Sequence, residues 1–175
     1  RNFFPNAKIY AFDPVEENCK IIKQRDSQKK IIIEKIAISN KRGKVQFYKN
    51  SYLPTSSLLS LDKQYERKFP LDKKIMVNTT TLDSYFKNNI PGKQIFLKID
   101  TQGSELKVLQ GAVRLLDKVS IIHIETNFPD YYINQCLFGD IYNFLTKLGF
   151  VYKGSIPDGQ FYPDFKLKLQ ENSIF

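Results

Sequence analysis

Short apolar runs alternate with stretches of helical apolar spacing along the chain, which predicts a succession of strands and helices. Strands are predicted at Lys8 to Phe12, Ile31 to Ser39, Lys44 to Lys49, Lys74 to Asn78, Gln94 to Ile99 and Val119 to Glu125. Helices are predicted from Pro14 to about Arg25, from Thr81 to near Asn88, after Ser104 with Leu106, Leu109, Val113 and Leu116 inward, and from Phe138 to Leu148. Two last runs, Phe150 to Lys153 and Phe165 to Leu169, predict a closing antiparallel pair. This order predicts an α/β sheet, mostly parallel, with an antiparallel C-terminal edge.

Length and composition predict one domain, residues 1–175, because no linker or repeat divides the chain. No apolar run approaches the roughly 20 residues of a membrane span, and no signal peptide pattern occurs, so a cytoplasmic protein is expected. Cys19 and Cys136 are isolated thiols and predict neither a disulfide framework nor a zinc site.

The formal net charge of +9 comes largely from lysines scattered over polar positions. A solvated lysine-rich surface explains this pattern, because no arginine-rich block or basic motif interleaved with aromatics occurs. We therefore expect no specific nucleic-acid partner.

The stretch from Gln94 to Ala112 has the one pattern that indicates chemistry rather than packing. A strand ends at Asp100, a turn follows around Gly103, and a helix begins after Ser104. In open parallel sheets the ligand crevice lies outside the carboxyl ends of the strands, so Asp100 is a candidate site residue.

The residues from Lys98 to Glu105, followed by Val108-Leu109 and Gly111-Ala112, resemble the K-I-D-x-x-G-x-E-x-x-V-L-x-G-A signature of the FkbM family of S-adenosylmethionine (SAM)-dependent methyltransferases. Further matches follow in order at Tyr10 to Pro14, Ser56 to Leu58, Thr80 to Asp83, Leu137-Phe138 and Leu148 to Phe150. The resemblance implies a Rossmann-like class I methyltransferase sheet with SAM as cofactor. It also implies O-methylation of a hydroxyl on a small-molecule or glycan acceptor, such as a sugar or secondary metabolite.

One part of that resemblance is missing. A SAM-binding sheet opens with a strand and a glycine-rich turn, whereas residues 1–5 run directly into the strand that matches the family's second. The missing first strand would lie between the strands at Lys8 to Phe12 and Gln94 to Ile99. We therefore expect an N-terminally truncated domain.

Asp13 has two interpretations. As an N-cap it would begin the helix that follows Pro14. As the acid at the end of a strand in a doubly wound sheet, it would accept hydrogen bonds from the ribose hydroxyls of the cofactor, which the resemblance favours. By the same resemblance, the loop after the next strand would lie against the adenine, which makes Ala37 and Ile38 candidate cofactor contacts. Asp100, which would face whatever binds in the crevice, is a further candidate cofactor contact.

Lys98, Asp100 and Glu125 are the candidate catalytic residues. Lys98 is a charge within an apolar strand, for which Glu125 is the expected partner. Asp100 and Glu125 are expected near neighbouring strand tips, where they could provide a general base or bind a metal, although no metal ligand set is assigned. Strand-end acids can equally be helix caps or partners of lysine.

Residues 50–70 are either a surface loop with a short helix or, by the resemblance, a segment that covers the acceptor site. In the second case Tyr52 and Ser57 are candidate substrate contacts. His123, the only histidine, is expected to be a structural imidazole in an apolar strand. Two other functions stay open at this point: a nicotinamide-dependent Rossmann oxidoreductase, and a non-catalytic basic module that binds polyanions.

Overall fold

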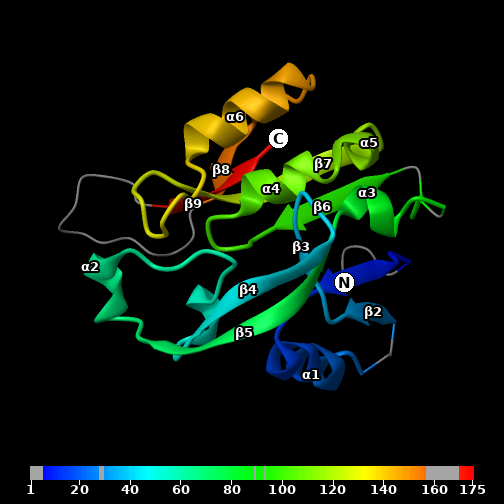
Figure 1. The fold of residues 1–175 in the computed structure, drawn as a ribbon. Coiled ribbons are helices and arrows are strands. Elements are labelled where there is room, and N and C mark those ends of the chain that lie inside the picture. Colours follow the sequence, from blue (N-terminus) through cyan, green and yellow to red (C-terminus); the bar gives the residue numbers. More distant parts are fainter. Residues whose placement is uncertain (1–5, 28–29, 89, 93, 157–169) are drawn as a thin grey trace.

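The computed structural model describes residues 6–27, 30–88, 90–92, 94–156 and 170–175, and within them it forms three sheets with flanking helices (Figure 1). The strands are β1 (Ile9–Phe12), β2 (Ile31–Glu34), β3 (Ala37–Ile38), β4 (Gly43–Asn50), β5 (Leu71–Thr80), β6 (Ile95–Ile99), β7 (Val119–Asn127), β8 (Gly154–Ile156) and β9 (Gln170–Ile174). The helices are α1 (Glu16–Arg25), α2 (Lys63–Glu66), α3 (Leu82–Tyr85), α4 (Glu105–Gln110), α5 (Val113–Leu116) and α6 (Phe138–Lys147), with a 3₁₀ turn η1 (Leu53–Thr55). A mixed α/β fold is therefore confirmed.

The largest sheet has the strand order β6-β7-β9-β8. β6 and β7 are parallel, and β9 is antiparallel to both of its neighbours. The predicted antiparallel pair at the C-terminus is thus present, but the antiparallel strand lies inside the sheet and β8 forms the edge. The pairing begins at Gly154, after the predicted range Phe150 to Lys153, and the range Phe165 to Leu169 lies outside the described residues.

The main core lies between this sheet and the helices α4, α5 and α6, which lie along the same side of it in Figure 1. Alternate side chains of β7 and the inner faces of the helices meet there. The fully buried members are Leu109, Ile122, Ile124, Ile141 and Leu145. Leu109 is one of the apolar residues whose helical spacing predicted the helix after Ser104.

The predicted strand from Ile31 to Ser39 is two strands that belong to different sheets. β2 pairs with β1 in parallel, and β3 pairs with β5 in parallel. The chain turns between them, because the N–H of Ile36 donates to the carbonyl of Glu34 at 2.9 Å and so leaves the ladder. β4, whose partner was not evident in the sequence, pairs along its length with the ten-residue β5, which the sequence predicted only from Lys74 to Asn78.

The predicted helix after Ser104 is divided into α4 and α5. The break falls at Gly111, where a Cβ atom would lie 2.2 Å from the carbonyl oxygen of Ser39. The helix therefore approaches the β3 segment more closely than any side chain allows. Val113, predicted to face inward, is 44% exposed as a result of the change in direction.

Within the described residues, β1 pairs only with β2, and β6 pairs only with β7. The resemblance to the family places a strand between these two edges, and the described part of the chain supplies none there. Among its helices, none combines the length and apolar character that crossing a bilayer requires; α1 and α6, the longest, have ten residues each.

Candidate active site

A cavity of about 650 Å³ lies at the carboxyl ends of β1, β3, β6 and β7 and is closed on another side by the segment around η1. Its volume is typical of a small-molecule site. Six of the residues predicted from the sequence line it: Asp13, Ala37, Ile38, Tyr52, Asp100 and Glu125. Residues as far as 112 positions apart in the sequence are thus brought to one cavity, as expected for strand ends in an α/β sheet.

Asp13 directly follows β1, and its carboxylate is half-buried in the cavity wall. Oδ1 accepts the backbone N–H of Val15 at 2.7 Å, and Oδ2 accepts the amide of Asn18 at 2.9 Å. α1 begins at Glu16 with Val15 as its N-cap, so the prediction of Asp13 as N-cap is wrong. Burial raises the pKa of Asp13, although the hydrogen bonds from Val15 and Asn18 lower it in part. The carboxylate is held in one orientation while its remaining lone pairs stay available to a ligand.

Ala37 and Ile38 form β3, beside Asp13 in the cavity wall, and both are buried. The parallel pairing of β3 with the end of β5 holds this short strand in place. Their side chains give the cavity an apolar surface next to a carboxylate. This combination suits a ligand that carries a flat apolar ring and neighbouring hydroxyl groups.

Asp100 directly follows β6, Glu125 lies two residues before the end of the neighbouring strand β7, and one side chain bridges them. Nε2 of Gln102 lies 3.0 Å from Oδ1 of Asp100 and 2.9 Å from Oε2 of Glu125. Glu125 is buried, and its Oε1 accepts a hydrogen bond from the amide of Gln170 on β9. The two predicted catalytic acids therefore belong to one cluster. We call Asp100, Gln102 and Glu125 the carboxylate bridge.

Lys98 pairs with Asp100, which directly follows the same strand. Its Nζ lies 3.0 Å from Oδ2 of Asp100, with both side chains about half exposed, so the prediction that Glu125 is its partner is wrong. Residues i and i+2 of an extended segment share a face, which explains why the residue two positions on becomes the partner. His123 lies opposite Lys98 in the parallel ladder, is half-buried and does not line the cavity.

The turn between β6 and α4 is held by the buried carboxylate of Glu105. Its Oε1 accepts the N–H groups of Thr101 at 2.8 Å and of Gly103 at 3.1 Å, as well as the hydroxyl of Thr101 at 3.2 Å. Burial raises the pKa of Glu105, while these hydrogen bonds lower it in part. The acid of the sequence signature therefore closes the turn that presents the carboxylate bridge and does not itself line the cavity.

The two predicted substrate contacts differ in position. Tyr52 is 56% exposed at the cavity wall, where its ring stacks on Phe69 with centroids 5.9 Å apart. Ser57 is 1% exposed and is absent from the cavity lining. Its hydroxyl donates to the carbonyl of Gln102 at 2.7 Å and accepts the N–H of Leu59 at 3.0 Å. Ser57 thus ties the segment around η1 to the turn after β6.

Sequence reasoning missed Gln102 and Tyr132. The hydroxyl of Tyr132 lies 2.9 Å from both Oε1 of Gln102 and the carbonyl of Thr55. Burial and the nearby acids raise the pKa of Tyr132 far above its usual range, so the hydroxyl stays protonated and can donate. A polar residue two positions after the strand-end acid was the available signal for Gln102. Nothing in the sequence pattern connects Tyr132 to the site, since it lies 30 positions away.

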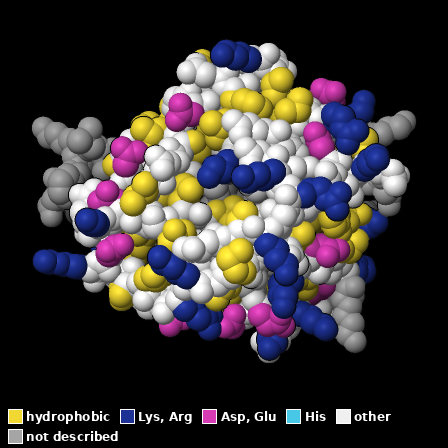
Figure 2. Space-filling view, viewed as in Figure 1, with side chains coloured by type: hydrophobic (Ala, Val, Ile, Leu, Met, Phe, Trp, Pro, Cys, Tyr) yellow, Lys and Arg dark blue, Asp and Glu magenta, His cyan; other side chains and the backbone are white. Residues whose placement is uncertain are grey.

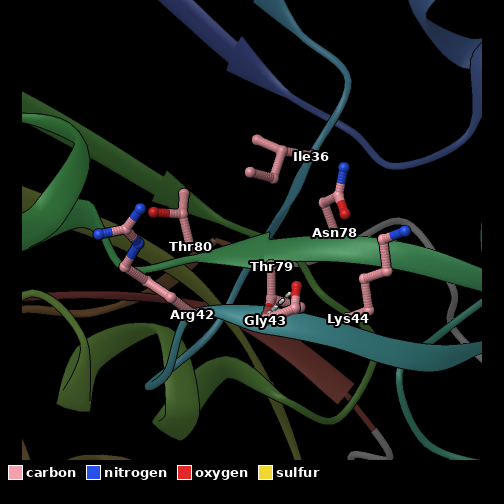
Figure 3. Close-up of a pocket in the computed structure, with 7 residues that line it drawn as sticks. All are labelled: Ile36, Arg42, Gly43, Lys44, Asn78, Thr79 and Thr80. Carbon is pink, nitrogen blue, oxygen red and sulfur yellow. Dashed lines mark hydrogen bonds between the residues drawn. The ribbon is translucent and has the colours of Figure 1, made fainter.

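A second cavity of about 640 Å³ lies at the start of β4 and the end of β5 (Figure 3). It is lined by Ile36, Arg42, Gly43, Lys44, Asn78, Thr79 and Thr80, and none of the predicted site residues is among them. Lys and Arg side chains are spread over the face in Figure 2 and are interspersed with acidic ones. Within the described ranges, no group of three or more His, Cys, Asp or Glu side chains is arranged to hold a metal ion.

Comparison with known proteins gives one match. The family model described as methyltransferase FkbM domain matches residues 3–152. No curated protein and no solved structure matches the chain. The matched range includes the first cavity's lining from Phe12 to Tyr132 and all three members of the carboxylate bridge.

Proposed function

Because the chain belongs to the FkbM methyltransferase domain family, we propose that it transfers a methyl group from SAM to a hydroxyl group of a small-molecule or glycan acceptor, such as a sugar or secondary metabolite. The observation that carries the proposal is the shared cavity, which has a carboxylate and an apolar surface where β1 and β3 end, here called the Asp13 end, and two bridged carboxylates where β6 and β7 end. A methyltransferase needs both a cofactor end and an acceptor end within reach of each other.

The Asp13 end of the cavity fits the nucleoside part of SAM. The carboxylate of Asp13 would accept hydrogen bonds from the two ribose hydroxyls, and its orientation is fixed by Val15 and Asn18. Ala37 and Ile38 would contact the adenine ring through their buried apolar surface. When bound, SAM supplies an electrophilic methyl group on a sulfonium sulfur.

The carboxylate bridge would serve the acceptor. A hydroxyl becomes a better nucleophile when a carboxylate removes its proton, and both Asp100 and Glu125 line the cavity. Lys98 fixes the outer oxygen of Asp100 by its ion pair. The exposed ring of Tyr52 offers an apolar face to an acceptor at the entrance, while Ser57 supports the wall from behind.

Isothermal titration of SAM into the 175-residue chain tests the cofactor assignment. We expect binding, weakened roughly 10- to 100-fold in Asp13→Ala, because a hydrogen bond to a charged group contributes about 1.5–3 kcal/mol. Asp72→Ala removes an exposed carboxylate on β5 and is the matched control, with an unchanged affinity expected. A folded wild-type chain that gives no heat, or an Asp13→Ala variant that binds as tightly as the wild type, would refute the assignment.

A further inference from the structure

Gln102 has an uncommon backbone conformation directly beside the two candidate catalytic acids. Its φ of 53° is in the left-handed region, which few residues other than glycine adopt. Its carbonyl accepts the hydroxyl of Ser57 at 2.7 Å, which fixes the turn in this conformation. Residues kept in such conformations cluster at functional sites, and this one lies beside two candidate catalytic acids.

The two acids determine the orientation of the Gln102 amide. Its Oε1 lies 2.9 Å from the protonated hydroxyl of Tyr132, whose one hydrogen can be donated either to this oxygen or to the carbonyl of Thr55, also at 2.9 Å. The reverse orientation would direct the carbonyl oxygen at the carboxylates of both Asp100 and Glu125, which have only acceptor atoms when ionised. The NH₂ group therefore faces the two acids and has one hydrogen for each.

Each carboxylate also has a second donor on its other oxygen. Lys98 occupies Oδ2 of Asp100, and Gln170 occupies Oε1 of Glu125. When two carboxylates lie at one site, ionisation of one disfavours ionisation of the other. Donors placed between and around them oppose that effect, since hydrogen bonds to a charged form stabilise it.

We propose that Gln102 is a positioning residue for proton transfer: its amide keeps Asp100 and Glu125 side by side and ionised, so that one of them can accept the acceptor's hydroxyl proton. The inference rests on the proposed methyltransferase function for its chemistry, while the bridge itself is a property of the chain alone. Tyr132 fixes the amide from the opposite side and links it to Thr55 in the segment around η1.

Other charged or titratable groups near the bridge come from three elements. Lys98 belongs to β6, Glu105 begins α4, and Tyr132 precedes α6. Of these, Lys98 has a positive charge, and Glu105 and Tyr132 have a buried carboxyl and a buried hydroxyl. A test must therefore change the amide and leave these groups in place.

The test is a ¹³C NMR titration of the side-chain carboxyls of Asp100 and Glu125 in the full chain without ligand. Gln102→Met keeps the length of the side chain and removes both donors, and Gln46→Met makes the same change at an exposed position on β4. We expect one of the two carboxyls to titrate about one pH unit or more higher in Gln102→Met than in the wild type, and no change in Gln46→Met. Unchanged titration of both acids in a folded Gln102→Met variant would overturn the proposal.

If Gln102→Met does not fold, Gln102→Glu tests the same proposal with a side chain of nearly identical shape. A third carboxyl at the bridge should raise the highest titration midpoint of the cluster above that of the wild type. If Asp100 and Glu125 each titrate at the same pH in the variant as in the wild type, the proposal is overturned. The control is Gln46→Glu.

Titration of SAM into the same samples separates this inference from the proposed function. We expect Gln102→Met to bind SAM within about twofold of the wild type, because Gln102 serves the acceptor end. A loss as large as that in Asp13→Ala would assign Gln102 to the cofactor and overturn the positioning role. A wild-type chain without SAM affinity would refute the proposed function only, and the carboxyl titration would still decide whether the bridge exists.

Discussion

The two ends of the cavity are built in different ways. At the Asp13 end, the carboxylate is held by Val15 and Asn18, which lie two and five positions away. At the other end, the contacts of Gln102 reach Glu125 and Ser57 across 23 and 45 positions. One end therefore depends on a local turn, and the other depends on the tertiary fold.

Because of this difference, we expect substitutions at the Asp13 end to affect mainly ligand binding and substitutions in the turn after β6 to affect mainly stability. A change at the Asp13 end removes a group that a ligand would contact, but few distant elements lose a partner. A change in the turn after β6 disturbs contacts between segments that are far apart in the sequence, because Ser57 and Tyr132 both connect that turn to the segment around η1. We expect substitutions at the two ends to differ more in their effect on unfolding than in their effect on ligand affinity.

Gly103→Ala should have the largest effect and tests the tertiary end directly. Gly103 has φ of 93°, and a Cβ there would lie 2.9 Å from Cβ of Gln135 and 3.1 Å from Cδ2 of Tyr132. The left-handed conformation costs an L-residue about 1–2 kcal/mol, and overpacking costs about 1–3 kcal/mol. We expect the free energy of unfolding, measured with urea, to fall by about 3 kcal/mol.

Gly139→Ala is the matched control, because no atom lies within 4 Å of its added methyl in α6. Alanine is the better helix former, so this variant should gain about 0.5–1 kcal/mol. Equal stabilities for the two variants would remove the distinction between a turn fixed by tertiary contacts and an ordinary glycine.

The sequence predicted the local features of this molecule well. The strand ending at Asp100, the turn and the following helix are present because each depends on neighbouring residues. The convergence of Asp13, Ala37 and Asp100 on one cavity was also predictable, since the carboxyl ends of parallel strands share an edge.

The features that the sequence could not predict depend on distant contacts. The apolar pattern from Ile31 to Ser39 gives no sign of the turn at Ile36, after which β3 joins a different sheet from β2. The partner of Lys98 was predicted wrongly because two acids were within plausible reach and only the side-chain geometry favours Asp100. The role of Tyr132 requires the fold, because its two acceptors come from different segments.

The pH dependence of stability tests the turn in a second way, through Glu105→Gln. Burial raises the pKa of Glu105 above its ordinary value of 4.5, so the folded chain binds this proton more tightly than the unfolded chain does. The contribution of Glu105 is therefore fully present below about pH 4.5 and is lost as the pH rises through its folded pKa, by about 1.4 kcal/mol for each unit of the difference. Glutamine keeps an acceptor for Thr101 and Gly103 but does not titrate.

We expect the unfolding free energy of the wild type, minus that of Glu105→Gln, to decrease as the pH rises from about 4 toward neutral. Urea unfolding at several pH values measures this difference. Glu66→Gln removes an exposed carboxylate on α2 and controls for the change in net charge. A difference that stays constant or increases with pH would mean that Glu105 is not destabilised by its burial.

Asn18→Ala should have the smallest effect and tests the local end. Asn18 donates to Oδ2 of Asp13 at 2.9 Å from within α1, so its loss frees the carboxylate to rotate away from a ligand. One such hydrogen bond contributes about 0.5–1.5 kcal/mol, and we expect SAM affinity to fall by roughly 2- to 10-fold. Stability should change by less than about 1 kcal/mol, because alanine's higher helix propensity offsets part of the lost bond. Asn143→Ala, exposed in α6, controls for that propensity gain and should leave SAM affinity unchanged. If Asn18→Ala instead lowered stability as much as Gly103→Ala does, the Asp13 end would depend on the tertiary fold as strongly as the carboxylate bridge.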